Sequence, residues 1–185
     1  LFSRVFKAPT NLESTYITAL ILIFIILPAK EISEFVFIIL AGIAAMASKY
    51  ILAINRKHIF NPAAIAVFAT SLLSLGYASW WVGNQWTLPV ILIGGLLITK
   101  KIKRLSLVLG FLATFLLATF YFSFTNQSDI IKTTQRLFLD SPILFFSFVM
   151  LIEPLTSPTT KKMQIIFAVL VGLLAGSQFS IGPIY

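Results

Sequence analysis

The sequence predicts an all-α polytopic membrane protein with about six to seven transmembrane helices. Of the 185 residues, 58% are hydrophobic and 11% are charged, and the mean hydropathy is +0.97. A soluble domain carries roughly 25% charged residues. The apolar residues also form runs separated by short turns, and each crossing needs about 20 residues. We therefore expect a single transmembrane domain over residues 1–185, in two loosely repeated halves, 1–104 and 105–185.

The first half contains four predicted spans, each bounded by a local signal. The turn that begins at Pro28 ends the first span, and basic residues 56–57 with His58 close the second. Asn61 and Pro62 begin the third, because proline fits the first turn of a helix. A Trp-rich stretch, 79–86, follows as an interfacial loop. These spans cover approximately residues 16–27, 35–54, 62–77 and 88–99.

The second half repeats this plan with three spans. They cover about residues 105–124 and 142–152 and a last segment that begins near Met163. Residues 125–136 form the longest polar loop. In the last span, Gly172 and Gly176 are four residues apart and form a small-residue face suited to close helix packing. Since the chain begins at Leu1 and its last stretch has no polar tail, we expect it to be a fragment of a longer protein.

The basic residues predict the orientation of the chain in the membrane. If the spans alternate in direction, ten basic residues lie on one side and three on the other, with Lys49 inside a span. Such a bias marks the richer side as cytoplasmic, and it explains the net charge of +8 better than nucleic-acid binding does. The richer side receives Arg4, Lys7, Arg56, Lys57, Lys100, Lys101, Lys103, Arg104, Lys161 and Lys162, and the other receives Lys30, Lys132 and Arg136.

Two polar, Pro-containing motifs interrupt the apolar runs about half a chain apart, at residues 58–64 and 153–160. Proline breaks or begins a helix. A broken helix inside a membrane frees backbone polar groups, which is tolerated only where they are buried in protein or line a cavity. Paired interruptions in two halves point to a binding site near the midplane. The motifs therefore predict that the chain holds a small ligand with at least one polar end.

Six polar residues of these motifs are candidate ligand-binding residues. Asn61 is either an N-cap for the helix that starts at Pro62 or part of an anion-binding helix terminus. The carboxylate of Glu153 either pairs with Lys161, Lys162 or Arg56, or accepts a hydrogen bond from a ligand. The remaining hydroxyl groups either form a capped turn or cradle a flavin ring or a phosphate. They belong to Thr156, Ser157, Thr159 and Thr160.

Several kinds of redox and metal site are excluded or disfavoured. The sequence has no cysteine, which excludes disulfides, iron–sulfur clusters and thiolate metal sites within it. It has one histidine, His58, so a haem held by two histidines of this chain is not expected. Because His58 follows Arg56 and Lys57, we expect its side chain to be solvated or to face lipid headgroups.

The two motifs resemble the RnfD/NqrB family, the flavin-carrying membrane subunits of Rnf and sodium-pumping NADH:quinone oxidoreductase complexes. The resemblance rests on Phe60-Asn61-Pro62-Ala63-Ala64 and on residues 153–161, where Glu153 stands in place of the family's Asp, and it extends over about residues 53–176. It implies two related five-helix bundles akin to urea transporters. The family often carries FMN on a threonine of a Ser/Thr-Gly-Ala-Thr stretch. Here the corresponding loop has only Thr133 and Thr134, which implies a non-covalent flavin, FMN or riboflavin.

The first functional hypothesis is therefore a membrane electron-transfer module. Electrons would pass from a cytoplasmic NAD(P)H- or ferredoxin-linked reductase domain or subunit to a quinone or an outward acceptor, with or without coupled ion transport. The cofactor would carry the redox chemistry. A prokaryotic inner (cytoplasmic) membrane is the expected location, and no nucleic acid is expected as a partner. The alternatives are a channel or transporter for a small polar solute, which uses the same interrupted helices, and a purely structural membrane anchor.

Overall fold

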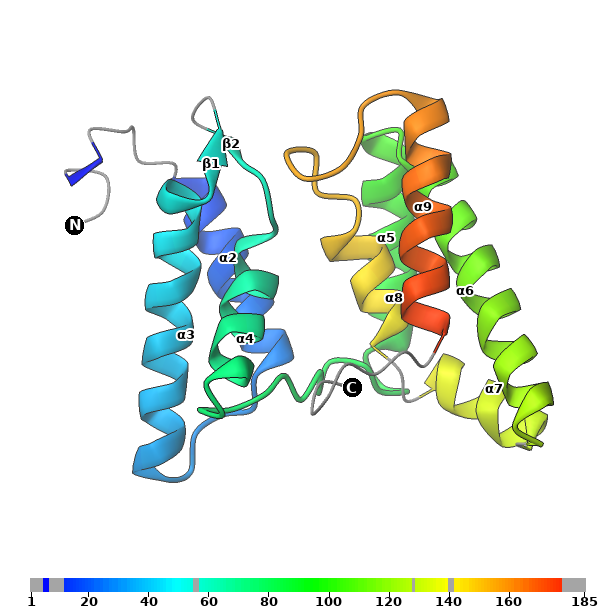
Figure 1. The fold of residues 1–185 in the computed structure, drawn as a ribbon, viewed down its shortest axis with the longest axis horizontal. Helices are drawn as coiled ribbons and strands as arrows, with labels where there is room; N and C mark the ends of the chain where they lie inside the picture. The colour runs from blue at the N-terminus through cyan, green and yellow to red at the C-terminus, as the bar shows by residue number, and fades with distance from the viewer. Residues whose placement is uncertain (1–4, 7–11, 55–56, 128, 140–141, 178–185) are drawn as a thin grey trace. The chain divides into compact units, whose positions relative to one another are not determined.

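The computed structural model describes residues 5–6, 12–54, 57–127, 129–139 and 142–177, and it is mostly helical (Figure 1). In the described part, two short strands lie among the helices. The elements in chain order are α2 (Leu12–Ile25), α3 (Ile32–Ile51), β1 (Ala53–Ile54), β2 (Lys57–His58), α4 (Pro62–Leu72), α5 (Leu88–Lys101), α6 (Leu105–Thr125), α7 (Ile130–Leu139), α8 (Ile143–Phe145), the π-helix η1 (Phe146–Met150) and α9 (Lys161–Gly176).

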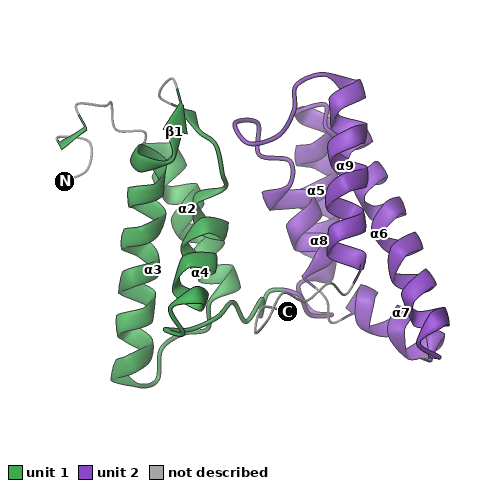
Figure 2. Cartoon of the chain, viewed as in Figure 1, with its two compact units in different colours: residues 1–82 green, residues 83–185 purple. Residues whose placement is uncertain are grey.

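The chain forms two compact units, Leu1–Val82 and Gly83–Tyr185 (Figure 2). The sequence predicted one domain whose halves divide after Arg104. The observed division comes earlier, in the Trp-rich loop, because α5 packs with α6, α8 and η1 of the second unit. That interhelical packing joins segments far apart in the sequence, and hydropathy does not reveal it.

Two helices of the described part, α3 and α6, are long and apolar enough to cross a membrane. This is fewer than the six to seven crossings predicted. The apolar helices α2 and α4 have 14 and 11 residues, short of the roughly 20 that a complete crossing needs. The sequence placed most helix boundaries correctly to within a few residues, but some predicted spans are shorter in the structure.

In the first unit, α3 packs closely against α4, and α2 contacts both helices. The side chains of Phe37, Ala41 and Ala45 on α3 and of Ala63 and Ala66 on α4 are buried. These alanines leave room for the helices to approach. At the start of α3, a carboxylate oxygen of Glu34 accepts hydrogen bonds from the backbone N–H groups of Lys30 and Glu31, so donors that have no partner within the helix are satisfied.

A β-hairpin follows α3, where the sequence predicted a continuous helical span to Ile54. Ala53 pairs with His58 and Ile54 pairs with Lys57 in antiparallel register. The prediction that His58 is solvated or faces lipid headgroups is also wrong, since only 7% of its surface is exposed. Apolar composition alone could not distinguish the last turn of a helix from a short strand.

The Trp-rich loop closes the C-terminal end of α2. The indole N–H of Trp81 donates to the carbonyl oxygen of Ile23 at 2.7 Å. The backbone N–H groups of Ser79 and Trp80 both donate to Ile25, at 2.9 and 3.2 Å. The last carbonyl groups of a helix have no partner within it, so this loop satisfies acceptors that α2 leaves unpaired. The sequence predicted only an interfacial loop here.

In the second unit, α6 and α9 pack against each other in parallel. Ser106 forms a hydrogen bond with Gln164 in the first turns of the two helices. Further along both helices, Gly176 lies against Ala118. A Cβ atom on Gly172 would lie 2.9 Å from the carbonyl oxygen of Phe111. The predicted close packing at Gly172 and Gly176 is therefore confirmed.

The core of the second unit is formed by α6, α8, η1 and α9, with α5 packed against it. Its buried side chains are Leu107, Val108, Phe111, Phe115, Leu144, Phe148, Leu151, Ile152 and Ala168. The predicted sixth span, 142–152, is one turn of α-helix followed by the π-helix η1. The backbone N–H of Leu151 donates to Phe146, a spacing of five residues. Such wide turns are frequent at functional sites.

Helix α7 begins within the segment 125–136 that the sequence predicted to be a polar loop, and it continues three residues beyond that segment. Asp129 begins it, since its carboxylate oxygen accepts hydrogen bonds from the backbone N–H groups of Ile131 and Lys132. No residue of α7 is buried. The loop prediction was wrong because the charged and hydroxyl residues were weighed by composition and not by their helical spacing.

Candidate functional site

The first motif is a helix start. The side-chain oxygen of Asn61 accepts hydrogen bonds from the backbone N–H groups of Ala63 and Ala64, both at 3.1 Å. Pro62 occupies the first helical position, where its missing N–H costs no hydrogen bond. The N-cap interpretation of Asn61 is confirmed. This oxygen, used twice by α4 itself, has limited capacity left for a ligand.

The second motif is a compact loop between η1 and α9. The hydroxyl of Ser157 donates to the backbone carbonyl of Glu153 at 2.7 Å. The backbone N–H groups of Thr156 and Ser157 donate to the same oxygen at 3.2 and 3.1 Å. The Thr156 hydroxyl lies 3.3 Å from a carboxylate oxygen of Glu153. Two of the predicted cradle hydroxyls therefore fold this loop back onto Glu153.

Two buried side chains, one just before α6 and one in the first turn of α9, hold the loop in place. A guanidinium nitrogen of Arg104 donates to the carbonyl oxygen of Pro158. The amide nitrogen of Gln164 donates to the carbonyl oxygens of Pro158 and Thr159, both at 3.3 Å, and its amide oxygen accepts from Ser106 at 2.9 Å. Arg104 and Gln164 are 7% and 3% exposed. The loop is thus fixed to the beginnings of α6 and α9.

Arg104 is a buried cation without an anionic partner among the described residues. Among those residues, the Arg104 side chain donates to the neutral carbonyl oxygen of Pro158 and to no carboxylate. Burying an unpaired charge is costly unless another group compensates for it. Glu153 is half-buried and accepts a hydrogen bond from Thr156, while Arg56, one of its predicted partners, lies outside the described residues. The surroundings of the Arg104 guanidinium therefore suit an anionic ligand better than a neutral one.

The last two motif residues lie at the start of α9. The Thr160 hydroxyl accepts from the backbone N–H of Met163 at 3.4 Å, so Thr160 is the N-cap. Thr159 is exposed. The first N–H groups of a helix lack partners within it and favour negative charge. Thr159 and the first turn of α9 therefore add donors close to the loop that Arg104 holds.

A further polar group is buried at the end of α5. The hydroxyl of Thr99 is fully buried and, within the part of the chain that the structure describes, has no hydrogen-bond partner. The backbone carbonyl of Thr99 accepts from the N–H of Arg104 at 3.0 Å, and Lys103 has φ 58°. This Schellman-type turn places Arg104 directly after α5.

The structure thus brings together five of the six predicted residues. Glu153, Thr156, Ser157, Thr159 and Thr160 share one loop of the second unit, whereas Asn61 belongs to the first unit. Sequence reasoning missed two contributors outside the motif, and only the run of charges at 100–104 was a signal for one of them. These contributors are Arg104 and Gln164.

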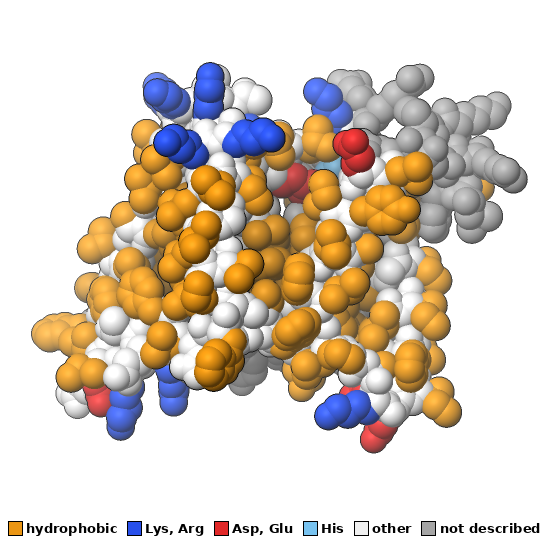
Figure 3. Space-filling view, turned by 180° about the vertical axis from the view of Figure 1, so that it is seen from behind, with side chains coloured by type: hydrophobic (Ala, Val, Ile, Leu, Met, Phe, Trp, Pro, Cys, Tyr) orange, Lys and Arg blue, Asp and Glu red, His pale blue; other side chains and the backbone are white. Residues whose placement is uncertain are grey.

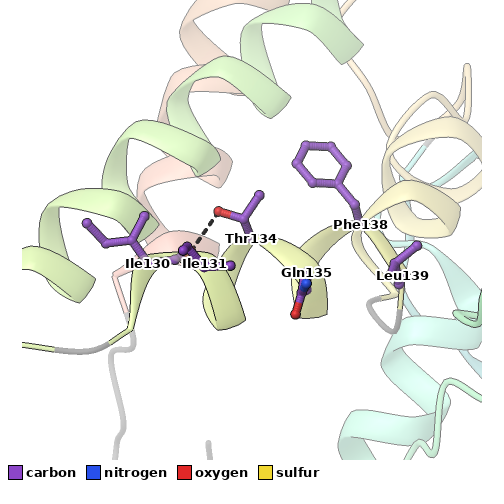
Figure 4. Close-up of a pocket in the computed structure, with 6 residues that line it drawn as sticks. All are labelled: Ile130, Ile131, Thr134, Gln135, Phe138 and Leu139. Atoms are coloured by element: carbon purple, nitrogen blue, oxygen red, sulfur yellow. Dashed lines mark hydrogen bonds between the residues drawn. The ribbon is translucent and has the colours of Figure 1, made fainter.

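A shallow apolar hollow lies apart from this loop, along α7 (Figure 4). The hydroxyl of Thr134 in its lining donates to the carbonyl oxygen of Ile130 at 2.8 Å, and the hydroxyl of Thr133 donates to Asp129 at 3.0 Å. Both hydroxyls of the segment compared with the family's flavin-bearing loop are therefore engaged by the helix backbone. The hollow offers apolar surface and few polar groups.

The donor set of the loop fits a phosphate group better than a flavin ring. Arg104, Thr159 and the start of α9 supply a positive charge and hydrogen-bond donors, while Thr156 and Ser157 are already engaged. Metal binding has less support, because the described residues include no cluster of three or more His, Cys, Asp or Glu side chains that could hold an ion.

Comparisons with protein-family models, curated proteins and solved structures found no match for this chain.

Proposed function

We propose that this chain is the membrane-embedded part of an electron-transfer system and that it binds FMN non-covalently. Electrons would pass from a cytoplasmic NAD(P)H- or ferredoxin-linked reductase to a quinone or an outward acceptor. The observation that carries the proposal is the buried Arg104, which holds the loop of the second motif and has no carboxylate partner among the described residues. The resemblance of that motif to the RnfD/NqrB family supports flavin as the ligand.

The surface of the long helices supports the membrane location, which we propose to be a multi-pass one in a prokaryotic inner membrane. In the most apolar stretches of α3 and α6, only 22% and 33% of the residues are buried. The core helix of a soluble protein would be mostly buried. Large apolar side chains such as Ile39 on α3 and Leu117 on α6 are 59% and 72% exposed. Lipid would cover this surface and remove it from water.

The distribution of charge supports the proposed orientation. Because α6 and α9 are parallel, the basic residues that precede α6 and those that begin α9 lie at the same end of the second unit. Figure 3 shows hydrophobic side chains along the helices and charged side chains near helix ends. An excess of Lys and Arg marks the cytoplasmic side. The loop that Arg104 holds would therefore open toward a cytoplasmic reductase.

Arg104 and the residues of the loop would fill two roles in holding the cofactor, binding the phosphate and keeping the loop rigid. Arg104 would compensate the charge of the phosphate, and Thr159 with the first turn of α9 would donate hydrogen bonds to it. Glu153, Thr156 and Ser157 would keep the loop rigid through their mutual hydrogen bonds. Bound flavin would supply one- and two-electron redox chemistry, which the protein tunes by position and charge.

The first experiment is an absorption spectrum of the detergent-purified chain before and after acid precipitation. We expect a flavin spectrum that moves to the supernatant. Flavin that stays with the pellet would overturn the non-covalent assignment. A folded chain without any chromophore would contradict the proposal and favour a solute transporter, which solute flux into liposomes would then test.

A pair of variants tests the role of Arg104. Arg104→Gln keeps a hydrogen-bond donor but removes the charge, so we expect a loss of bound FMN. Lys132→Gln removes a charge from α7 and should leave the FMN content unchanged. Equal FMN content in folded wild type and Arg104→Gln would show that Arg104 does not hold the phosphate.

A further inference from the structure

We propose that α7 is an interfacial anchor whose apolar face lies in the headgroup region of the bilayer, at the end of α6. This inference goes beyond electron transfer, and it rests on the membrane location of α6 in the proposed function. It concerns a segment that lies apart from the loop held by Arg104. The proposed occupant of the apolar face is lipid.

The residues of α7 separate into an apolar and a polar side. Ile130, Thr134 and Phe138 are spaced by four residues, and Ile131 lies beside them, so they share one side of the helix. Ile130, Ile131 and Phe138 are 46%, 71% and 44% exposed. Half of the helix is apolar although none of its residues is buried. Such a face is stable only if something apolar covers it.

The connection to α6 fixes the depth of α7 in the membrane. Helix α6 ends at Thr125, and Gln127 then adopts φ 53°, which turns the chain out of the helix. The linker 126–129 spans less than roughly 20 Å even if it is fully extended. Figure 1 shows α7 running crosswise to α6 at this end. If α6 crosses the membrane, α7 must therefore lie near the level where α6 leaves it.

The side chains near the junction are those typical of a membrane boundary. Tyr121 and Phe124, in the last turns of α6, are 65% and 75% exposed. Exposed aromatic rings concentrate at the headgroup level, although Tyr and Trp show this preference most clearly. The end of α6 that leads into α7 thus exposes aromatic rings. Lipid that covers this end of α6 would also reach the apolar face of α7.

The charges of α7 suit lipid headgroups. Lys132 and Arg136 are also four residues apart, on the side away from Ile131 and Phe138. Lys132 lies 3.7 Å from Asp129, and both side chains are largely exposed. Cationic side chains beside an apolar face are typical of helices that lie in the plane of the membrane. Leu137 meanwhile packs against the core of the second unit, which holds α7 to the bundle.

The absence of cysteine in the sequence allows a direct test. Single-cysteine variants of the full chain would carry the environment-sensitive fluorophore NBD, in vesicles of phosphatidylcholine and phosphatidylglycerol. Ile131→Cys and Phe138→Cys probe the apolar side, and Lys132→Cys and Arg136→Cys are matched controls on the other side. Leu117→Cys, which replaces an exposed residue of α6, reports whether α6 itself lies in lipid.

We expect the labels at positions 131 and 138 to show blue-shifted emission, loss of emission with doxyl-labelled lipid and protection from aqueous iodide. The labels at 132 and 136 should lose emission with iodide. Equal iodide quenching on both sides would overturn the proposal, because α7 would then lie in water. Protection of 131 and 138 from both quenchers would also overturn it and would indicate a protein partner or a second copy.

Failure of this inference can be distinguished from failure of the proposed function. If the label at position 117 is quenched by lipid and those at 131 and 138 are not, α6 is in the membrane and the anchor is wrong. If the label at 117 is not quenched either, the membrane location fails and the anchor falls with it. The flavin spectrum of the same unlabelled protein reports separately on the cofactor.

Discussion

Gly94 and Gly95 are adjacent in α5, yet alanine should have opposite effects at these two positions. A Cβ atom on Gly95 would lie 2.5 Å from Cβ and 2.6 Å from Cγ of Phe148, where ordinary van der Waals contact begins at 3.4 Å. A Cβ atom on Gly94 would meet nothing within 4 Å. Phe148 is 4% exposed and belongs to η1, so its Cβ cannot withdraw unless the π-helix moves.

The magnitudes follow from two effects. Alanine favours a helix over glycine by about 1 kcal/mol, and this gain applies equally to both positions. Overpacking a well-filled core costs about 1–3 kcal/mol, and this cost applies only to Gly95. We expect Gly94→Ala to raise the free energy of unfolding by up to about 1 kcal/mol. Gly95→Ala should be less stable than Gly94→Ala by about 1–3 kcal/mol.

The assay is reversible unfolding of the detergent-solubilised chain with increasing sodium dodecyl sulfate, followed by circular dichroism. Because the two variants have the same composition, their difference isolates the contact with Phe148. Equal stability of the two variants, or a more stable Gly95→Ala, would refute the packing of α5 against η1.

Substitutions at three further positions test other local features by the same assay. Gly172→Val should lower the free energy of unfolding by about 1–3 kcal/mol or more, because a Cβ there would lie 2.9 Å from the carbonyl oxygen of Phe111 and from Cβ of Thr114; an unchanged midpoint would argue against the close approach of α6 and α9. Asn61→Ala should cost about 1 kcal/mol through loss of the N-cap, and Asn61→Asp should recover most of it; equal losses in both variants would mean that the cap oxygen is not the cause. Ser74→Gly should stabilise the chain by about 0.5–1 kcal/mol, since Ser74 has φ 54° and glycine adopts that region without steric strain; a destabilised variant would contradict this.

Helix starts were predictable because their signals are local. Asn61 and Pro62 lie next to each other, and together they determine where α4 begins. The bounds of α6 were also close to the prediction, because its apolar run is long and ends abruptly in charged or polar residues. The small residues at Gly172 and Gly176 predicted a close helix contact, although they could not identify α6 as the partner.

The hairpin and α7 were missed for different reasons. The apolar run that ends at Ile54 suits a helix or a strand, and the pairing of Ala53 with His58 decided between them. The segment that forms α7 did contain a usable signal, the spacing of Ile130, Thr134 and Phe138. Its charged residues and hydroxyls obscured that signal when the segment was judged by composition.

The candidate site shows the same division between local and distant causes. The bonds from Thr156 and Ser157 to Glu153 span three or four residues, and a Pro-containing run of hydroxyl residues suggests such a turn. Arg104 lies 54 residues before Pro158. In the sequence it is one of several cations in a basic run, and only the fold distinguishes it from its exposed neighbours.

The sequence by itself determined the apolar, helical character of the chain, the positions where several helices begin and the polar loop around Glu153, because composition, capping and turn chemistry act between near neighbours. The tertiary structure alone decided that Gly95 contacts Phe148 while Gly94 faces open space, and that Arg104 is buried against the Pro158 carbonyl. These outcomes depend on which helix faces pack together. Packing is a property of segments far apart in the sequence, so no local pattern specifies it.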